Sequence, residues 1–140
     1  MNKAPVWFVV VAVLTLLWNL VGCLAIAADL AVLASGAVAT LPPEQQAMYA
    51  ARPLWTVIGS CLAVLAGAAG CLGLVMRRRW ATSLLIASLA GLLVQDAGFV
   101  VMNGQAPLPL FAIVMQVGVL AIAIALVILA RMASRRGWLR

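Results

Sequence analysis

Long apolar runs alternate along the chain with short polar or proline-containing segments. Four runs, at residues 6–32, 54–76, 80–102 and 108–130, are almost entirely hydrophobic. A helix needs about 20 apolar residues to cross the hydrocarbon core of a bilayer, and each run is long enough. None shows the two-residue alternation of a barrel strand, and a helix satisfies its own backbone hydrogen bonds in lipid. The pattern predicts an all-α membrane protein: a bundle of four transmembrane helices, antiparallel in up-down-up-down order, in one domain.

The segment between the first two runs, residues 35–53, predicts an additional short helix. It contains Pro42 and Pro43, which suit a first helical turn, and Glu44 follows near the positive end of the helix dipole. Pro53 closes the segment. We expect a short interfacial helix in a periplasmic loop, serving as a connector, a lid or a platform for a partner.

Composition narrows the class of protein. Of the 140 residues, 67% are hydrophobic and 9% are charged, whereas soluble domains have about 45–50% and 25%. Three acids and nine bases are too few to cover the surface of a soluble protein. The apolar excess must face lipid, so the bilayer is the expected environment.

The distribution of basic residues predicts the orientation. In a four-span arrangement, eight of the nine Lys and Arg residues fall on one side, and Arg52 falls on the other. The eight are Lys3, Arg77, Arg78, Arg79, Arg131, Arg135, Arg136 and Arg140. Because cytoplasmic loops are enriched in Lys and Arg, we expect both termini in the cytoplasm of a bacterial inner-membrane protein, with residues 131–140 as a basic tail. These bases flank apolar runs, which indicates membrane anchoring and no nucleic-acid partner.

Residue types that support common catalytic and metal chemistry are scarce. The chain has no histidine, and Cys23, Cys61 and Cys71 form no CxxC pair. We therefore expect no enzyme activity, no cofactor and no metal site. The string at residues 20–23 matches a lipoprotein cleavage site, but the apolar run continues beyond it. We expect the first helix to remain uncleaved.

Small residues recur at four-residue spacing in the last three runs. Helices approach one another closely in membranes where Gly, Ala and Ser share a face, so these positions are expected at helix interfaces. The expected packing positions are Gly59, Ala63, Gly67, Gly70, Ala87 and Gly91, with Ala121 and Ala125 in the fourth run.

Polar residues within or beside the apolar runs form the candidate site, because each is costly in lipid without a partner. With a rise of about 1.5 Å per residue, Asn19 falls near mid-membrane and the others fall in or above the outer half. The candidate set for a substrate or an ion is Asn19, Asp29, Arg52, Gln95, Asp96 and Gln116.

Two interpretations of this set remain open. In the structural one, Asp29 lies in water at headgroup level, and Asp96 pairs with Arg52 or bonds the two glutamines, which sets the helix register. In the functional one, Asp96 is an ionisable group in a cavity open to the periplasm, where it binds a cation or a proton.

Several strings resemble a group of small bacterial inner-membrane proteins of similar length. They lie at residues 2–8, 16–22, 41–49, 77–81 and 136–139, and LLWNLVG at 16–22 is the most specific. The similarity extends over the whole chain. Such proteins often carry a sugar-transporter label without an established activity, so the resemblance implies a four-helix inner-membrane protein and no defined chemistry.

Two functional hypotheses follow. In the first, the chain is a non-enzymatic accessory or assembly protein that binds a larger membrane protein or a second copy of itself. In the second, it is an oligomeric small-solute transporter that uses the outer polar cluster, with sugar uptake or cation coupling as its activity. Four spans are too few for a carrier built from paired repeats, which favours the first hypothesis.

Overall fold

The computed structural model describes residues 4–104 and 109–140, and within these ranges all regular structure is helical. The elements are α1 (Val6–Ser35), the 3-10 helix η1 (Ala37–Thr40), α2 (Pro43–Ala51), α3 (Leu54–Val75), α4 (Trp80–Asn103) and α5 (Leu110–Arg135). Four of them, α1, α3, α4 and α5, are long and apolar enough to cross a membrane. The all-helical class and the four candidate spans are thereby confirmed.

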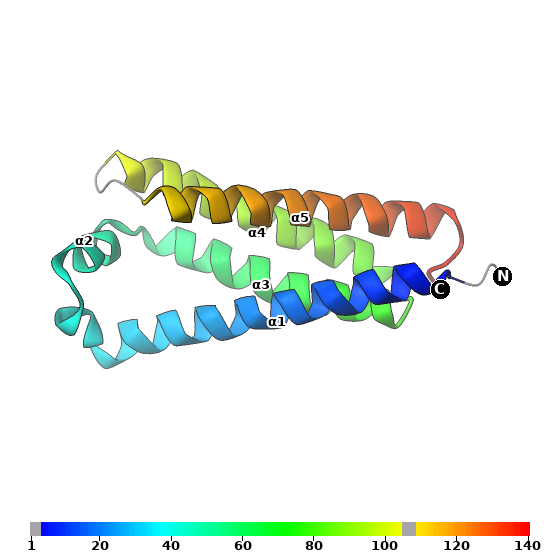
Figure 1. Ribbon diagram of the computed structural model, residues 1–140, viewed down its shortest axis with the longest axis horizontal. Coiled ribbons are helices and arrows are strands. Elements are labelled where there is room, and N and C mark those ends of the chain that lie inside the picture. The colour runs from blue at the N-terminus through cyan, green and yellow to red at the C-terminus, as the bar shows by residue number, and fades with distance from the viewer. Residues whose placement is uncertain (1–3, 105–108) are drawn as a thin grey trace.

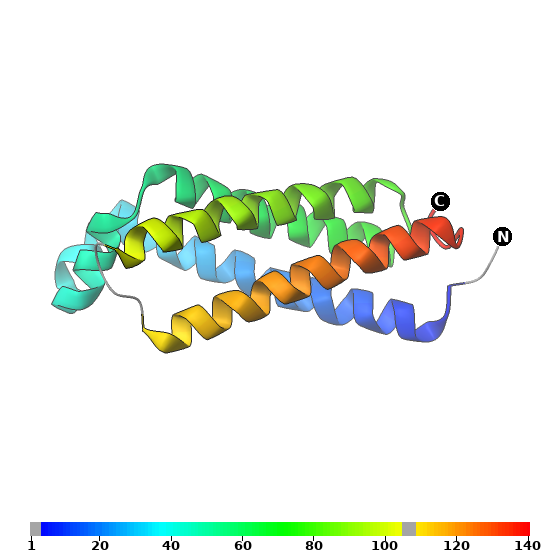
Figure 2. The same cartoon turned by 90° about the horizontal axis from the view of Figure 1, so that it is seen from above.

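The four long helices lie along one axis of the molecule, and α2 lies at one end of the bundle (Figure 1). The start of α1 and the C-terminus lie at the opposite end. α3 and α4 form the most extensively packed pair, α1 packs on α3, and α5 packs on α4 (Figure 2). Among the described residues, no comparable backbone packing joins α1 to α5.

Glycines allow the close approach of α3 and α4. A Cβ added to Gly59 would lie 2.9 Å from the carbonyl oxygen of Gly91, and one on Gly91 would lie 2.8 Å from the backbone nitrogen of Ala63. A Cβ on Gly70 would lie 2.7 Å from Cγ of Leu85. Any larger side chain at these positions would push the two backbones apart, so the small residues set the spacing of the central pair.

The small residues outside α3 are distributed differently from the expected ladder. Ala87 is half-buried, and the buried row of α4 next to it is formed by Leu85 and Ser88. Ala121 and Ala125 of α5 are exposed, which corrects the expectation that they pack inside. The buried face of α5 lies farther along the helix and is formed by Leu126, Val127, Ala130 and Ala133, the two alanines at 0% exposure.

The C-terminal segment is packed against the bundle, which corrects the expected basic tail at 131–140. α5 continues to Arg135, beyond the expected end at residue 130, because no helix-breaking residue occurs before Gly137. Gly137 has a φ of 70°, the left-handed conformation that glycine accepts most easily. Trp138 and Leu139 are then buried at 8% and 2% exposure. The backbone nitrogen of Arg140 also donates to the Arg77 carbonyl at 2.6 Å.

The main core lies at this same end of the molecule. It contains Phe8 and Ala12 from α1, together with side chains from α3, α4, α5 and the C-terminal segment. The Trp138 ring packs edge-on against Phe8 at 5.5 Å and against Trp7 at 5.9 Å between ring centroids. This core joins α1 to α5 at the end of the bundle far from α2.

Candidate functional site

Two cavities lie between the helices on the side of the bundle nearer to α2. The inner cavity, about 320 Å³, is lined by α1, α3, α4 and α5 and includes Asn19, Ser88, Gln95 and Gln116. The outer cavity, about 1120 Å³, lies beside α2 and includes Asp29, Glu44, Tyr49, Arg52 and Gln95. Ala25, Ile26 and Gln95 line both cavities, so the two adjoin. We call the pair the α1–α5 groove.

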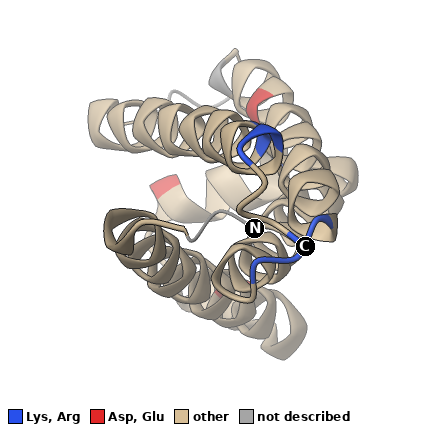
Figure 3. Ribbon diagram, turned by 90° about the vertical axis from the view of Figure 1, so that its right-hand side faces the viewer, with Lys and Arg blue, Asp and Glu red and all other residues tan. Residues whose placement is uncertain are grey.

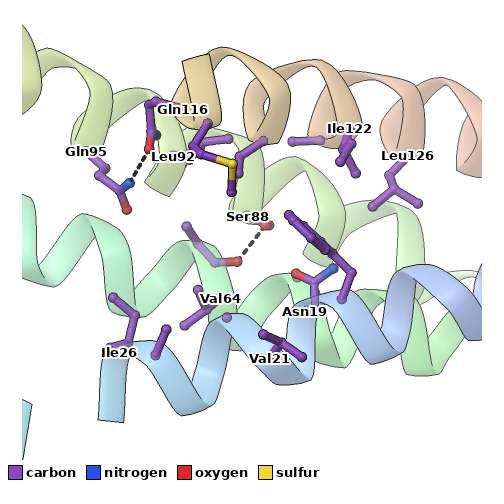
Figure 4. Close-up of a pocket in the computed structure, with 18 of the residues that line it drawn as sticks. Asn19, Val21, Ile26, Val64, Ser88, Leu92, Gln95, Gln116, Ile122 and Leu126 are labelled. Carbon is purple, nitrogen blue, oxygen red and sulfur yellow. Dashed lines mark hydrogen bonds between the residues drawn. The ribbon is translucent and has the colours of Figure 1, made fainter. Parts of the chain in front are cut away.

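Asn19 lies on the α1 side of the inner cavity, and its amide orientation is set by the backbone. Its Nδ2 donates to the Thr15 carbonyl at 2.9 Å and approaches the sulfur of the buried Cys71 at 3.5 Å. A carbonyl oxygen only accepts hydrogen bonds, so the NH₂ group must face Thr15. The Oδ1 atom lies over Gly67, where an added Cβ would overlap it. Figure 4 shows this oxygen on the opposite side of the amide from the Nδ2 atom, next to Ser88.

A second polar group joins α4 to α5. Nε2 of Gln95 donates to Oε1 of Gln116 at 3.2 Å, and Nε2 of Gln116 donates to Oδ1 of Asp96. Because the Gln116 amide gives its NH₂ group to Asp96, its oxygen is the atom that faces Gln95. The Oε1 atom of Gln95 then points away from Gln116 and toward the cavity (Figure 4).

The third polar group lies in the outer cavity. Nη1 of Arg52 contacts Oδ2 of Asp29 at 2.5 Å, and the Tyr49 hydroxyl donates to Oδ1 of the same carboxylate at 2.7 Å. The side chains of Arg52 and Asp29 retain 18% and 22% exposure, so the ion pair is only partly shielded from solvent. The hydrogen bond to the Asp29 carboxylate raises the pKa of Tyr49 above its ordinary value of 10.0.

The structure therefore divides the six candidate residues into three groups. Arg52 pairs with Asp29, which corrects the alternative in which it pairs with Asp96. Asp29 is half-buried and bonded, and does not lie free in water. Asp96 accepts a hydrogen bond from Gln116, and Gln116 accepts one from Gln95. This arrangement agrees with the alternative in which Asp96 bonds the two glutamines. Asn19 belongs to neither cluster, although it shares the inner cavity with the glutamines.

Two contributors were not expected from the sequence. The Tyr49 hydroxyl donates to the Asp29 carboxylate. Tyr49 of α2 and Arg52, the C-cap of that helix, are three residues apart and therefore face the same side, where both bind this carboxylate. This spacing was the sequence feature that could have identified Tyr49. Ser88 is buried and donates from Oγ to the Ala63 carbonyl at 2.6 Å, which ties α4 to α3 beneath the inner cavity. Its signal was its place among Leu85 and Leu92 on one helix face.

Charge is segregated along the bundle. Figure 3, seen from the end that carries the C-terminus, has the basic residues toward the viewer and the acidic residues farther back. Of the three acids of the chain, Asp29 and Glu44 line the outer cavity together with Arg52, and Asp96 lies in the second half of α4. Among the described residues, no group of three or more Asp, Glu or Cys side chains is placed to hold a metal ion.

Comparisons of the chain with protein-family models, with curated proteins and with solved structures find no match. The resemblance to small inner-membrane proteins therefore stays a prediction. The function has to be inferred from the geometry of the α1–α5 groove.

Proposed function

We propose that this chain is a non-enzymatic accessory or assembly protein of a bacterial inner membrane, and that it binds another membrane component in the α1–α5 groove. In this proposal the four long helices cross the bilayer in up-down-up-down order. The termini lie in the cytoplasm with the arginine-rich end, and α2 lies at the periplasmic interface.

The observation that carries this proposal is the unequal packing of the outer helices. Helices of a closed four-helix bundle each pack against two neighbours. Among the described residues, α1 and α5 share a core near Phe8 and Leu126, and the inner cavity lies between the two helices beyond it. The amides of Asn19 and Gln95 lie in that space, where exposure to lipid tails is unfavourable. A bound component that covers the groove would remove this cost.

A site-specific crosslinking experiment tests the proposal. A photoreactive amino acid at Val119 of α5, which lines the inner cavity, should form an adduct with a membrane component in intact cells. The same group at Ile128, which is 63% exposed on α5 and lines neither cavity, is the matched control. Native mass spectrometry in mild detergent should then find the crosslinked component bound to the unmodified chain. Equal labelling at both positions, or no retained component, would overturn the proposal.

A small-solute transporter is the second candidate, and the polarity of the outer cavity favours it. Asp29, Arg52 and Tyr49 make one end of the groove polar, whereas the packed core around Phe8 and Trp138 closes the other end. A solute site that is open on one side and closed on the other is one state of an alternating-access carrier. As a carrier, the protein would have to work as an oligomer.

Uptake by the purified protein discriminates the two candidates. Proteoliposomes that contain this chain alone should not accumulate sugars or monovalent cations if it is an accessory protein. Uptake that is lost in the Asp96→Asn variant, with the variant still folded by circular dichroism, would establish the carrier and overturn the accessory proposal.

A further inference from the structure

The groove presents the amide oxygens of Asn19 and Gln95, because the NH₂ group of each amide already donates a hydrogen bond within the protein. Asn19 donates to the Thr15 carbonyl, and Gln95 donates to Gln116, whose own NH₂ group is taken by Asp96. Turning over the Asn19 amide would place its oxygen against the Thr15 carbonyl oxygen, and turning over the Gln95 amide would place it against Gln116 Oε1, so either change loses a bond. The oxygens of Asn19 and Gln95 remain for a ligand. A ligand that donates hydrogen bonds fits this groove better than one that accepts them.

The charge near the groove has the matching sign. Glu44 lines the outer cavity, and Asp29 beside it is balanced by Arg52. The charged residues that line the outer cavity, Asp29, Glu44 and Arg52, have formal charges that sum to −1. Electrostatic attraction at such a site favours a cation over an anion.

The rest of the groove is apolar and contains aromatic rings. Ile26 of α1 and Val119 and Ile122 of α5 line it between Gln95 and Asn19, and Trp18 lies at the edge of the inner cavity. Phe99 and Tyr49 line the outer cavity, where a cation can contact the face of a ring. Small-molecule sites are typically of this kind, largely apolar with a few placed polar groups.

We infer that the α1–α5 groove binds a lipophilic primary ammonium, with its N–H donors on Gln95 Oε1 where the two cavities adjoin and its apolar tail against Ile26, Val119 and Ile122. Along α1, residues 19 to 26 span about 10 Å at 1.5 Å per residue, which leaves room for the part of an alkyl chain next to its ammonium group. The inference rests on the groove being the working surface of the proposed function, and it assigns the chemistry of what the groove holds.

Matched amphiphiles test this assignment on the purified full-length chain. The probe is n-dodecylammonium, measured by native mass spectrometry as a one-to-one adduct, against dodecyltrimethylammonium, dodecanol and dodecanoate. The trimethylammonium has the charge without N–H donors, dodecanol has a donor without the charge, and dodecanoate has the opposite charge. One charge-assisted hydrogen bond should favour dodecylammonium by about tenfold over each of the others. Equal binding of dodecyltrimethylammonium or dodecanoate would overturn the assignment.

Two variants locate the site. Gln95→Leu removes the acceptor and should weaken dodecylammonium binding by about tenfold, and should weaken dodecanol binding less, because the dodecanol hydrogen bond to the same oxygen carries no charge. Glu44→Lys, at an exposed position of α2, should weaken it several-fold even if Gln95→Leu does not fold. Ser134→Lys, exposed at the opposite end of α5, is the charge control and should leave binding unchanged. If Glu44→Lys and Ser134→Lys behave alike, the ligand is not in the groove.

Failure of this inference is distinguishable from failure of the proposed function. Dodecylammonium binding is measured on the isolated protein, whereas the Val119 adduct is measured in cells. A retained partner without amine selectivity would overturn only the ligand assignment. Amine selectivity without a partner would overturn only the accessory role.

Discussion

The contact between Gly67 and Asn19 allows a specific prediction, because Gly67 lies at a helix interface and the Asn19 amide faces the α1–α5 groove. Replacing Gly67 by alanine would place a Cβ on top of Asn19 Oδ1 and 3.0 Å from Ser88 Oγ. Ser88 is held by its bond to the Ala63 carbonyl, so Asn19 is the side chain that must move. Its bond to Thr15 then breaks or lengthens.

Three terms set the expected size of this effect. Overpacking a filled interface costs about 2 kcal/mol, and a lost hydrogen bond costs about 1 kcal/mol net. Alanine recovers about 1 kcal/mol of helix propensity relative to glycine. Gly67→Ala should therefore destabilise the protein by about 2 kcal/mol. In an Asn19→Ala background the overlapped oxygen is gone, and the same substitution should cost less than about 0.5 kcal/mol.

The assay is reversible unfolding in mixed detergent micelles, followed by far-UV circular dichroism for the single variants and the double variant. Gly118→Ala on α5 is the matched control, since nothing lies within 4 Å of a Cβ at that position. It should be neutral or stabilising by up to about 1 kcal/mol. The reasoning is refuted if Gly67→Ala behaves like Gly118→Ala, or if its cost is the same with and without Asn19.

Four further measurements address the two ends of the bundle and its core. Asp29→Asn should lower the pKa of Tyr49 toward 10.0, since the carboxylate bond raises it, and alkaline titration of tyrosinate absorbance reads the shift in this single-tyrosine chain. The same bond makes the native protein lose stability as pH rises from about 10 through the folded-state pKa, a loss that should shrink in Asp29→Asn. Trp138→Ala should destabilise the protein by about 3 kcal/mol in the same detergent unfolding assay, and an unchanged transition would contradict the packed C-terminal segment. Cys71, at 0% exposure, should react with a small maleimide far more slowly than the half-buried Cys61, and equal rates would mean that the core around it is open.

The candidate spans could be predicted because helix formation in lipid depends on local composition. The run beginning at residue 54 and the helix beginning at Leu54 agree, since Pro53 sets that boundary in both. The C-terminal end of α5 was predicted less accurately, at residue 130 in place of Arg135. Lys and Arg residues do not end a helix, so the basic segment after residue 130 continued to Arg135. The burial of Trp138 depends on contacts with Phe8, which is distant in sequence.

The partners of the polar residues could be predicted only in part. Depth along the helices correctly brought Gln95, Asp96 and Gln116 together, because rise per residue converts sequence position into height. The height of a residue along a helix does not give the direction in which its side chain points around the helix axis. From height alone, Arg52 could therefore pair with Asp29 or with Asp96. In the structure Arg52 pairs with Asp29, and Tyr49, three residues before Arg52, donates to the same carboxylate.

The groove itself could not be predicted, for a physical reason specific to membranes. In water, a buried helix face is more apolar than an exposed one, so sequence patterns report the packing. In lipid both faces are apolar, and small residues become the main signal of contact. That signal identified α3, where Gly59 and Gly67 are buried, but it was misleading for α5, where Ala121 and Ala125 are exposed. An opening between α1 and α5 leaves no compositional mark. In the sequence, the groove is indicated only by the few amide side chains that face it. The direction of their hydrogen bonds follows from the structure, in which Asp96 accepts from Gln116.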